Sequence, residues 1–563
     1  MKSSAKKLNL SLEGELNKVI EKSKIRLLFL VSAVCITFII IAAKTVKLTF
    51  FLDSEIKESK VITAKKNLKE FKRPKIYDRE GNLISTSLKT SSLFANPKIM
   101  IEKEKAANEL SKIFPSLKKS DLLEKFNSDK SFIWIKRNLH PQQKYRANAI
   151  GVPGLIFKDE EKRIYPHGGL FSHLIGTVGI DGNGLAGLER GLDKKIKESN
   201  NGIDDITTSL DIRVQTIVRE EVLKQVKKHK AKKGIGIVLN VTNGEVISAV
   251  NYPDFDSNLP GKAKNKNMFN SITLGNYELG SIFKPISFAM GLEENKVKMW
   301  SVIDASEPLE VSRFTITDFH PKERKLSLPE ILMYSSNIGT AKIAKRVGNS
   351  KMKEYFEKLK FYEKLDIEVP EKSKPIMPRV WRDVNTLTAS YGHGIASSPM
   401  HAVAAIATTI NGGLYFQPTI IKQAKPPVGK RIFSKKTSDN MRKLMRLVVS
   451  EKGASGGKGE AKGYFVGGKT GTAEKLSDGK YDKKKLTSSF VGVFPMTKPE
   501  YIVLVTLDEP KGTKDTWNFA TGGWVSAPAV SKIISRIAPI LKVEPVNEND
   551  PKIKKEFKVK YKI

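Results

Sequence analysis

One long apolar segment near the N-terminus stands apart from the shorter patterned segments that follow it. Residues 27–43 read LLFLVSAVCITFIIIAA without a charge, which predicts a membrane-spanning helix over residues 27–48 if the flanking lysines snorkel. A cleaved signal peptide is the alternative, but signal peptides usually have a shorter apolar core and an A-x-A-like cleavage site. Because Ala42-Ala43-Lys44 fits such a site poorly, we expect an uncleaved anchor.

Apolar positions that recur every three or four residues predict several helices. Val214, Val218, Val222 and Val226 lie on one face of a helix. Longer helical patterns cover residues 281–295, 327–348, 400–412 and 436–451.

Strand patterns lie on both sides of this helical block. GIGIVLNV and EVISAV flank an Asn-Gly turn at residues 242–244 and predict a hairpin. YIVLVTLD, residues 501–508, predicts a buried strand, and a helical face formed by Val530, Ile533, Ile537 and Ile540 could cover it, with a kink at Pro539. Strands on both sides of a helical block indicate an α+β domain.

The N-terminal part of the chain and the far C-terminus have weaker patterns. Residues 53–72 read as a helix or stalk, and RPKIYDREGNLISTSL, residues 73–88, predicts two strands around a turn. Residues 101–150 look mixed and largely helical. The tail from residue 546 is polar and basic, so we expect it to be disordered.

Composition adds a large positive charge to this outline. The 563-residue chain has a net charge of +38, and its length allows about three or four domains. A basic chain can bind nucleic acid, an anionic membrane or an acidic polymer, but these lysines are scattered and match no nucleic-acid-binding motif. We therefore interpret them as a solvated surface. The single cysteine, Cys35, excludes an intrachain disulfide and a cysteine-based metal site.

A candidate nucleophile lies in ELGSIFKP, where Ser281 precedes Lys284 by three positions. These positions share a helix face, so a neutral lysine could take the proton of the serine hydroxyl. Gly280 permits a sharp entry into the helix, and Pro285 confines the pair to the first turn. Alone, the pair reads more simply as a helix cap, since S-x-x-K recurs by chance, as at Ser116.

Two later stretches change that interpretation. SSN (residues 335–337) lies in LMYSSNIGTAK at a predicted turn before a helix, and KTGT (residues 469–472) lies in the strand-like YFVGGKTGTAEK. Individually, Ser335 or Asn337 could be a helix cap and Lys469 a solvated edge lysine. In this order, however, S-x-x-K, a serine–Asn element and K-T-G are shared by class A β-lactamases and penicillin-binding proteins.

From about residue 70 to 525 the chain resembles a class B penicillin-binding protein. IYDREGNLI resembles the family's R-G-x-I-x-D-R-N-G-x-x-L signature, and KRIYPHGGLFSHLIGTVG with GLAGLE resembles its N-terminal module. TTSLDIRVQ, GEVISAVNYPDFDSN, GHGIASSP and SSFVGVFP fit successive blocks of the family. YELGSIFKP and LDEP resemble the division-specific FtsI type more than the elongation type, which usually carries Y-P-P-G-S.

The chain departs from the family pattern at four places outside the catalytic positions. Pro74 follows Arg73 where the family has glycine, Glu80 replaces the usual Asn, and Leu279 replaces the usual proline before Gly280. GASGG, residues 453–457, replaces a G-T-A element. These departures put local geometry in question and leave the chemistry unchanged.

The resemblance implies an α+β protein with a single transmembrane helix, an extended mixed pedestal module and a β-lactamase-like transpeptidase domain whose sheet is covered by helices. The implied segments are a cytoplasmic tail (1–26), the anchor (27–48), a stalk (49–72), a dimerisation or pedestal module (73–225), the transpeptidase domain (226–545) and a basic tail (546–563).

The family's roles carry over to matching positions. Ser281 would be the acyl-ester nucleophile and Lys284 its general base. Ser335, supported by Lys469, would relay a proton to the leaving group, and Asn337 would bind the substrate amide and hold Lys284. The implied substrate-binding residues are Thr470, Gly471 and Thr472, and the backbone N–H groups of Ser281 and Thr472 would form the oxyanion hole. The resemblance implies no cofactor and no metal.

The implied activity is cross-linking of peptidoglycan stem peptides that end in D-Ala-D-Ala, with β-lactams as inhibitors. The expected location is the bacterial inner membrane at the division septum, crossed once, with the N-terminus cytoplasmic and the catalytic domain periplasmic. Expected partners are the membrane and divisome proteins, including a septal glycan polymerase, and we expect no nucleic acid. The alternatives are an elongation-type transpeptidase, a β-lactamase, and a β-lactam sensor or scaffold without turnover.

Overall fold

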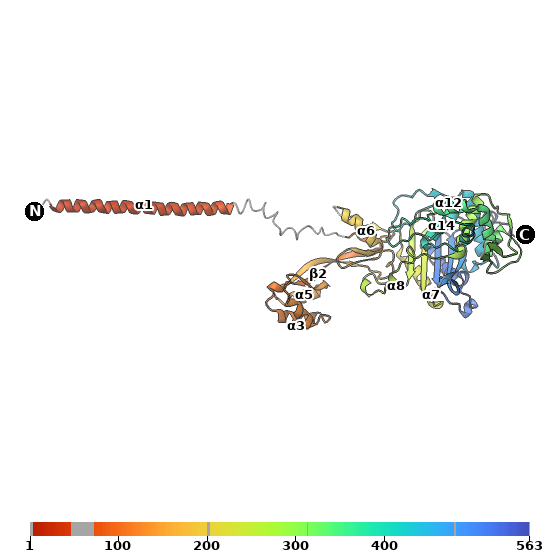
Figure 1. Ribbon diagram of the computed structural model, residues 1–563, viewed down its shortest axis with the longest axis horizontal. Helices are drawn as coiled ribbons and strands as arrows, with labels where there is room; N and C mark the ends of the chain where they lie inside the picture. The colour runs from red at the N-terminus through yellow and green to blue at the C-terminus, as the bar shows by residue number, and fades with distance from the viewer. Residues whose placement is uncertain (1–3, 47–72, 200–202, 312–313, 478–479, 562–563) are drawn as a thin grey trace. The chain divides into compact units, whose positions relative to one another are not determined.

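The computed structural model describes residues 4–46, 73–199, 203–311, 314–477 and 480–561 (Figure 1). The chain divides into two compact units, Met1–Phe71 and Lys72–Ile563.

The N-terminal unit contains helix α1, Ser4–Val46. Its segment Ile20–Val46 is long and apolar enough to cross a membrane, which confirms the apolar helix that the sequence predicts. The last two residues of the predicted anchor and the predicted stalk at residues 49–72 lie outside the described residues.

The second unit begins with a small sheet of strand order β3-β2-β1-β7, in which β4 also pairs with β2. Asp78 organises the predicted turn between the first two strands, since its carboxylate accepts hydrogen bonds from the backbone N–H groups of Glu80 and Asn82. The strands are β1 Ile76–Tyr77, β2 Leu83–Ala95, β3 Ile133–Leu139, β4 Leu155–Ile164 and β7 Ile206–Thr207. The helices are α3 Lys103–Ile113, α4 Lys119–Phe126, α5 Pro141–Asn148 and α6 Gly187–Glu198, and the first three share an apolar core with β2 and β3.

A buried carboxylate ties these elements together. Glu189, fully buried on α6, forms ion pairs with Arg73 at 3.0 Å and Arg163 at 2.7 Å. The side chain of Arg73 also pairs with Asp193. Removing one member of such a buried group leaves an uncompensated charge, which is costly. The ion pairs therefore hold Arg73 and Arg163 against α6.

A five-stranded antiparallel sheet of order β16-β17-β18-β8-β9 forms the centre of the larger domain. β18 is its middle strand and β16 one of its edges. The strands are β8 Lys233–Asn240, β9 Val246–Tyr252, β16 Gly467–Ser477, β17 Lys480–Phe494 and β18 Tyr501–Asp508. The predicted hairpin with the Asn-Gly turn is therefore the pair β8–β9, and the predicted buried strand is β18.

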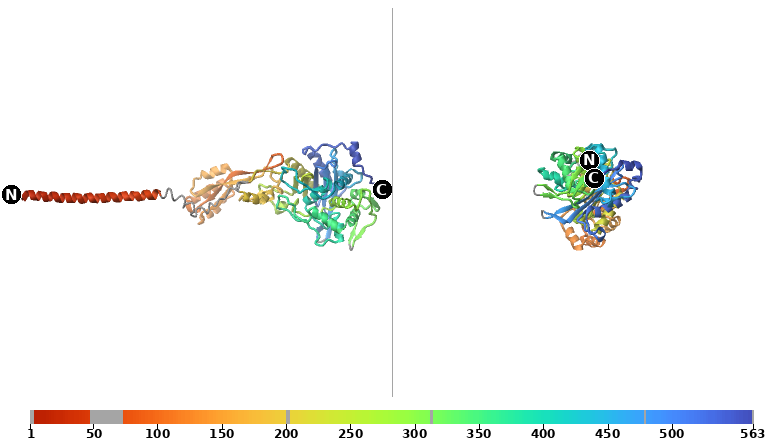
Figure 2. Two further views of the ribbon diagram at one scale, coloured as in Figure 1. Left: turned by 90° about the horizontal axis from the view of Figure 1, so that it is seen from above. Right: turned by 90° about the vertical axis from the view of Figure 1, so that its right-hand side faces the viewer.

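Alternate side chains of β18 face two different cores, as the period of two in a strand requires. Val503 and Val505 pack in a cluster with residues of α7 (Ile212–Lys228) and α17 (Ala527–Ile537). Ile502 and Leu504 pack in the other cluster, with residues of α9 (Lys284–Glu293), α14 (Pro399–Ile410) and α15 (Lys435–Ser450). Helices thus cover both faces of the sheet, and the α+β architecture is confirmed (Figure 2).

Shorter elements complete the domain. The helices are α8 Asn265–Met268, α10 Leu328–Met333, α11 Asn337–Val347, α12 Asn349–Lys358, α13 Asp383–Ala389, α16 Gly522–Val525 and α18 Pro551–Glu556. Four two-stranded ribbons are formed by β5 Thr177–Val178 with β6 Gly184–Ala186, β10 Val302–Asp304 with β13 Lys325–Ser327, β11 Leu309–Val311 with β12 Phe314–Ile316, and β14 Leu414–Tyr415 with β15 Lys430–Arg431.

Helix α7 spans the division that the sequence suggests between residues 225 and 226. Its buried valines pack against β8 and β9, so both halves of the helix contact the large sheet. The division between the modules at this point remains a proposal.

The structure corrects two predictions near the C-terminus. Helix α17 ends at Ile537, so Pro539 follows the helix and does not kink it. Residues 546–561 of the tail are ordered, contrary to the prediction. The Phe557 ring lies 4.9 Å from the ring of Phe465, and the Tyr561 hydroxyl donates to Glu451. These two aromatic anchors outweigh the polar composition of the tail.

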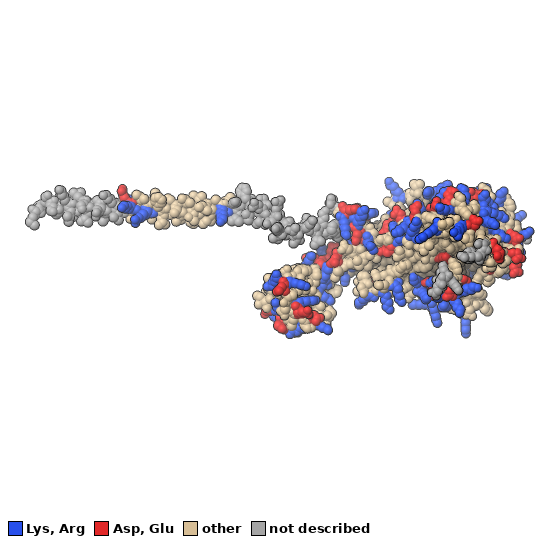
Figure 3. Space-filling model, viewed as in Figure 1, with Lys and Arg blue, Asp and Glu red and all other residues tan. Residues whose placement is uncertain are grey.

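The distribution of charge agrees with the interpretation of a solvated basic surface. Figure 3 shows Lys and Arg spread over the visible face of the second unit, with Asp and Glu among them.

The tail contacts generate a test of stability. We expect Phe557→Ala to lower the free energy of unfolding by about 2 kcal/mol, because a partly buried ring is lost from the edge of the core. Denaturant unfolding measures this loss, and the exposed Lys558→Ala serves as the neighbouring control. Equal stability of the two variants would mean that the tail does not hold the domain together.

Candidate active site

The candidate nucleophile lies at a junction between two kinds of helix. A 3₁₀ turn covers Gly280–Phe283, and α9 starts at Lys284, where φ is −54° and ψ is −40°. Pro285 therefore occupies the first turn of α9, where its missing N–H group costs no helical hydrogen bond. Gly280 has a φ of +59°, and a Cβ there would lie 2.9 Å from the carbonyl oxygen of Thr472. Only glycine suits this entry, as the sequence suggests.

Lys284 is fully buried and makes three hydrogen bonds with the SSN motif. Its Nζ lies 3.0 Å from the hydroxyl of Ser335 and 2.8 Å from Oδ1 of Asn337, and it also contacts the carbonyl oxygen of Ser335. Ser335 has a φ of +61° in the turn between α10 and α11, a left-handed conformation uncommon for serine. This turn is where two motifs, 51 residues apart, come together.

Lys469 reaches the same serine from β16. Its Nζ lies 2.9 Å from the Ser335 hydroxyl, and it donates to the carbonyl oxygen of Thr470 at 3.0 Å. The hydroxyl of Ser335 therefore lies between two lysine amines, and all three motifs meet at one side chain.

Burial of two amines so close together shifts the protonation of both. Burial lowers the pKa of Lys284 to about 7, although the charge of Asp318 raises it. Burial, and then the charge of Lys284, lower the pKa of Lys469 well below its ordinary value. A lysine amine with such a pKa is available as a base near neutral pH.

The hydroxyl of Ser281 makes no hydrogen bond to another residue within the described part of the chain. Lys284 Nζ thus hydrogen-bonds to Ser335 and Asn337, without the hydrogen bond to Ser281 that the spacing suggests. Hydrogen bonds of this kind are often formed only when a substrate is bound.

The sequence interpretation did not identify Asp318 and Ser455. The carboxylate of Asp318 accepts from the backbone N–H groups of Asn337 and Ile338 at the start of α11. The hydroxyl of Ser455 accepts from the hydroxyl of Thr470 at 3.1 Å. Asp318 lies 19 and 20 residues before its two partners, and no periodic pattern links them. Ser455 lies within the GASGG stretch, which departs from the family pattern.

The KTGT strand forms the edge of the sheet beside the nucleophile turn. Thr472 Oγ1 accepts a hydrogen bond from the backbone N–H of Gly522 at 3.1 Å. A Cβ at Gly471 would lie 2.6 Å from the carbonyl oxygen of Leu279 and 2.7 Å from Cγ2 of Ile282. Close packing against the nucleophile turn thus accounts for the glycine at this position.

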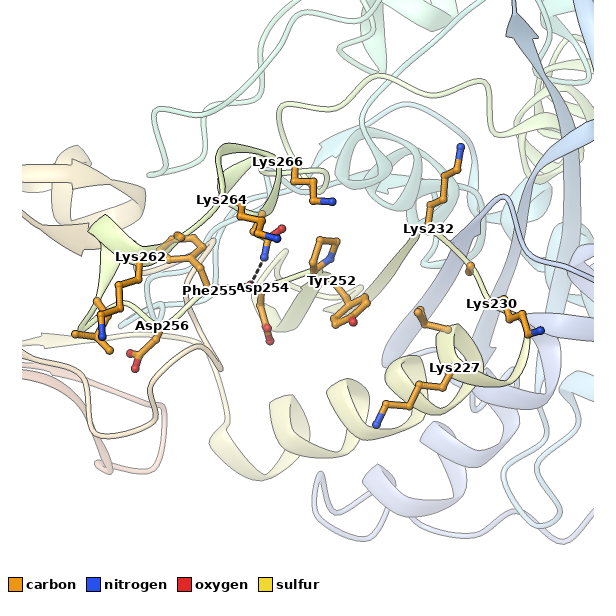
Figure 4. Close-up of a pocket in the computed structure, with 16 residues that line it drawn as sticks. Lys227, Lys230, Lys232, Tyr252, Asp254, Phe255, Asp256, Lys262, Lys264 and Lys266 are labelled. Atoms are coloured by element: carbon orange, nitrogen blue, oxygen red, sulfur yellow. Dashed lines mark hydrogen bonds between the residues drawn. The ribbon is translucent and has the colours of Figure 1, made fainter.

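A cavity of about 670 Å³ lies elsewhere, between the end of α7 and residues 252–267 (Figure 4). Lysine side chains surround it, and none of the three motifs contributes to its lining. Within the described part of the chain, no group of three or more His, Cys, Asp or Glu is placed to hold a metal ion.

Comparison with known proteins gives two family matches. Residues 234–535 match the penicillin binding protein transpeptidase domain, and residues 69–222 match the penicillin-binding protein dimerisation domain.

Individual proteins are similar over most of their length. The chain is 36% identical to "Probable peptidoglycan D,D-transpeptidase FtsI" of Caulobacter vibrioides, covering 85% of this chain and 84% of that protein. It is 33% identical to "Probable peptidoglycan D,D-transpeptidase PenA" of Neisseria gonorrhoeae, covering 84% and 85%. It is also 28% identical to "Stage V sporulation protein D" of Bacillus subtilis, covering 92% and 86%.

The packing of Gly471 generates a test of the site's construction. We expect Gly471→Ala to lower the free energy of unfolding by about 2 kcal/mol, because its Cβ overlaps the nucleophile turn. Gly261→Ala is the matched control, since a Cβ there meets nothing within 4 Å. Thermal unfolding of both variants measures the difference, and an unchanged Gly471→Ala protein would contradict the packing account.

Proposed function

We infer the activity of the chain from its family: it belongs to the class B penicillin-binding proteins of the FtsI type. On this basis we propose that it cross-links peptidoglycan stem peptides during cell division. It is a D-Ala-D-Ala transpeptidase that works through a serine acyl-enzyme. The observation that carries the assignment of roles is the meeting of Lys284 and Lys469 at the hydroxyl of Ser335.

In the proposed acylation step, Ser281 Oγ attacks the carbonyl carbon of the penultimate D-Ala of the donor stem. Lys284, whose pKa is lowered to about 7, takes the proton of the serine hydroxyl. The bond from that carbonyl carbon to nitrogen breaks, and the terminal D-Ala leaves as an amine. Ser335 passes a proton to this nitrogen, and Lys469, 2.9 Å away, supports the transfer.

In the second step, the amine of a neighbouring stem attacks the ester and releases Ser281. The new amide bond joins the two stems, and one proton of the amine passes through the same lysine and serine groups to the oxygen of Ser281. Water in place of the amine would give hydrolysis.

Substrate binding follows from the residues around this centre. Asn337 would bind the substrate amide and hold Lys284, which its Oδ1 contacts at 2.8 Å. The backbone N–H groups of Ser281 and Thr472 would stabilise the oxyanion. The hydroxyls of Thr470 and Thr472 would bind the terminal carboxylate of the stem. Gly471 would act indirectly, by letting the strand approach the nucleophile turn.

The cellular setting is part of the same proposal. The apolar helix Ile20–Val46 fits a protein that crosses the membrane once. We place the N-terminus in the cytoplasm and the catalytic domain in the periplasm, at the septum, beside a glycan polymerase of the division machinery. β-Lactams, which mimic D-Ala-D-Ala, would acylate Ser281. The chain is also similar to a protein named for sporulation. The septal role therefore rests on its similarity to the relatives named FtsI.

The nucleophile assignment has a direct test. We expect Ser281→Ala to lower covalent labelling by a fluorescent penicillin by roughly 10⁴-fold or more, because the variant lacks the hydroxyl that forms the proposed ester. Ser116→Ala is the matched control: Ser116 also starts an S-x-x-K sequence, and it lies in the N-terminal module. Ser281→Ala should also fail to support septation in cells depleted of the native protein.

Two outcomes would count against the proposal. Normal septation with Ser281→Ala would favour a scaffold or sensor. Rapid loss of the penicillin label from the unmodified protein would favour a β-lactamase.

A further inference from the structure

The C-terminal tail, residues 546–561, lies against helix α15 and takes no part in the proposed chemistry. Near the start of the tail, Glu548 forms an ion pair with Arg446 on α15 at 3.0 Å. At the end of α18, Glu556 forms another with Arg442, one turn earlier on the same helix, at 3.5 Å. The tail is therefore attached to α15 at two points before it reaches its last described residue.

That last described residue, Tyr561, joins two elements of the larger domain. Its backbone carbonyl oxygen accepts a hydrogen bond from the hydroxyl of Ser327 at 2.6 Å. Its own hydroxyl donates to Oε2 of Glu451 at 2.5 Å. Ser327 is the N-cap of α10, and Glu451 is the C-cap of α15. One residue of the tail thus connects the start of one helix to the end of another.

Helix α10 leads directly into the SSN turn. It has six residues, which rise about 9 Å in all, and it ends at Met333. The backbone N–H of Ser335 donates to the carbonyl oxygen of Leu332 at 3.2 Å, and that of Ser336 donates to Ile331 at 2.9 Å. The turn is thus hydrogen-bonded to the last turn of the helix. A shift of α10 therefore moves the hydroxyl to which both buried lysines donate.

The second anchor of the tail leads to the other side of the site. Glu451 lies four residues before Ser455. The backbone N–H of Ser455 donates to the carbonyl oxygen of Met333 at 3.2 Å, and its hydroxyl accepts from Thr470 at 3.1 Å. The loop that follows α15 thus links the last residue of α10 to the KTGT strand. Both anchors of Tyr561 therefore lead to the same centre.

The chemistry of both anchors is specific. The buried hydroxyl of Ser327 accepts from the backbone N–H of Glu330 at 3.4 Å, and the tail supplies the acceptor for its own proton. The hydrogen bond to the Glu451 carboxylate raises the pKa of the Tyr561 hydroxyl to about 12, so this hydroxyl stays a donor at neutral pH. A hydrogen bond to an ionised carboxylate is stronger than one between neutral groups.

We propose that Tyr561 is a positioning residue for acylation, because through Ser327 and Glu451 it holds the turn of Ser335 and the loop of Ser455. This inference rests on the proposed function and adds a residue that lies 234 positions from Ser327. Tyr561 acts through its two anchors and not on the substrate.

Two chains that differ by one residue test the positioning role. A chain that ends at Lys560 lacks Tyr561 and both anchors, whereas a chain that ends at Tyr561 keeps them and is the matched control. The rate constant for acylation of Ser281 by a fluorescent penicillin is measured for each in detergent, well below the unfolding temperature. We expect the chain that ends at Lys560 to react about tenfold more slowly, because the acceptor hydroxyl is no longer held in place. The control should react as the unmodified protein does.

Tyr561→Phe separates the two anchors. It removes the hydroxyl that donates to Glu451 and keeps the carbonyl oxygen that accepts from Ser327, so the rate constant should fall by a smaller factor, about threefold. In a protein that already carries Glu451→Ala, the same substitution should have no further effect, because the partner of the hydroxyl is gone.

The pH profile distinguishes positioning from simple stabilisation. Release of the turn admits water beside Lys284, which is close to Lys469 and Asp318, and the pKa of its amine should return toward the ordinary value. The midpoint of the acylation rate should therefore move to higher pH in the chain that ends at Lys560. A tail that only stabilises the fold would lower the fraction of protein that is labelled, without changing the rate constant or the midpoint of that fraction.

The outcomes separate this inference from the function on which it rests. An unchanged rate constant and midpoint in the chain that ends at Lys560 overturn the positioning role and leave the transpeptidase proposal standing. If that chain does not fold, an unchanged rate constant in Tyr561→Phe overturns the role, as do additive losses from Tyr561→Phe and Glu451→Ala. If penicillin does not label Ser281 in the unmodified protein, the proposed function fails and the positioning role fails with it.

Discussion

The hydrogen bonds from two buried lysines to the hydroxyl of Ser335 are the interaction on which the rest of the site depends. An isolated buried ammonium is costly, and two that share one acceptor cannot both keep their ordinary affinity for protons. The protein supports them with fixed acceptors: the backbone carbonyl oxygen and hydroxyl of Ser335, Oδ1 of Asn337, and the carbonyl oxygen of Thr470. The left-handed turn at Ser335 and the edge strand β16 hold these acceptors in place.

Much of this arrangement could be predicted from the sequence, because short motifs encode it. S-x-x-K, SSN and KTGT identified the side chains that meet, and valine periodicity identified α7. The Asn-Gly turn identified the β8–β9 hairpin, and the apolar run at residues 501–508 identified β18. Pro285 lies in the first turn of α9, which begins one residue before it. What the pattern could not give was the direction in which Lys284 points, since i and i+3 spacing permits contact with Ser281 without requiring it.

The remaining differences have local physical causes. The ordered tail escaped prediction because a window of lysines hides the two aromatic residues, Phe557 and Tyr561, that anchor it. Asp318 escaped because its contacts with α11 are long-range and leave no periodic signal. The reason for Gly471 is the nearness of Leu279 and Ile282, which only the packed structure reveals. In each case tertiary contacts decide a feature on which local sequence is silent.

The central claim, that burial makes Lys284 a base at neutral pH, is tested most directly by the pH dependence of Ser281 acylation. The rate constant for labelling by a fluorescent penicillin is measured on the full-length protein between pH 5 and 9. Since the amine acts only when it is unprotonated, the rate should rise with pH around a midpoint near 7. In Asp318→Asn the midpoint should move lower, because the charge of Asp318 raises the pKa of Lys284. A rate that stays flat across this range, or rises only toward the ordinary pKa of lysine, would contradict the account.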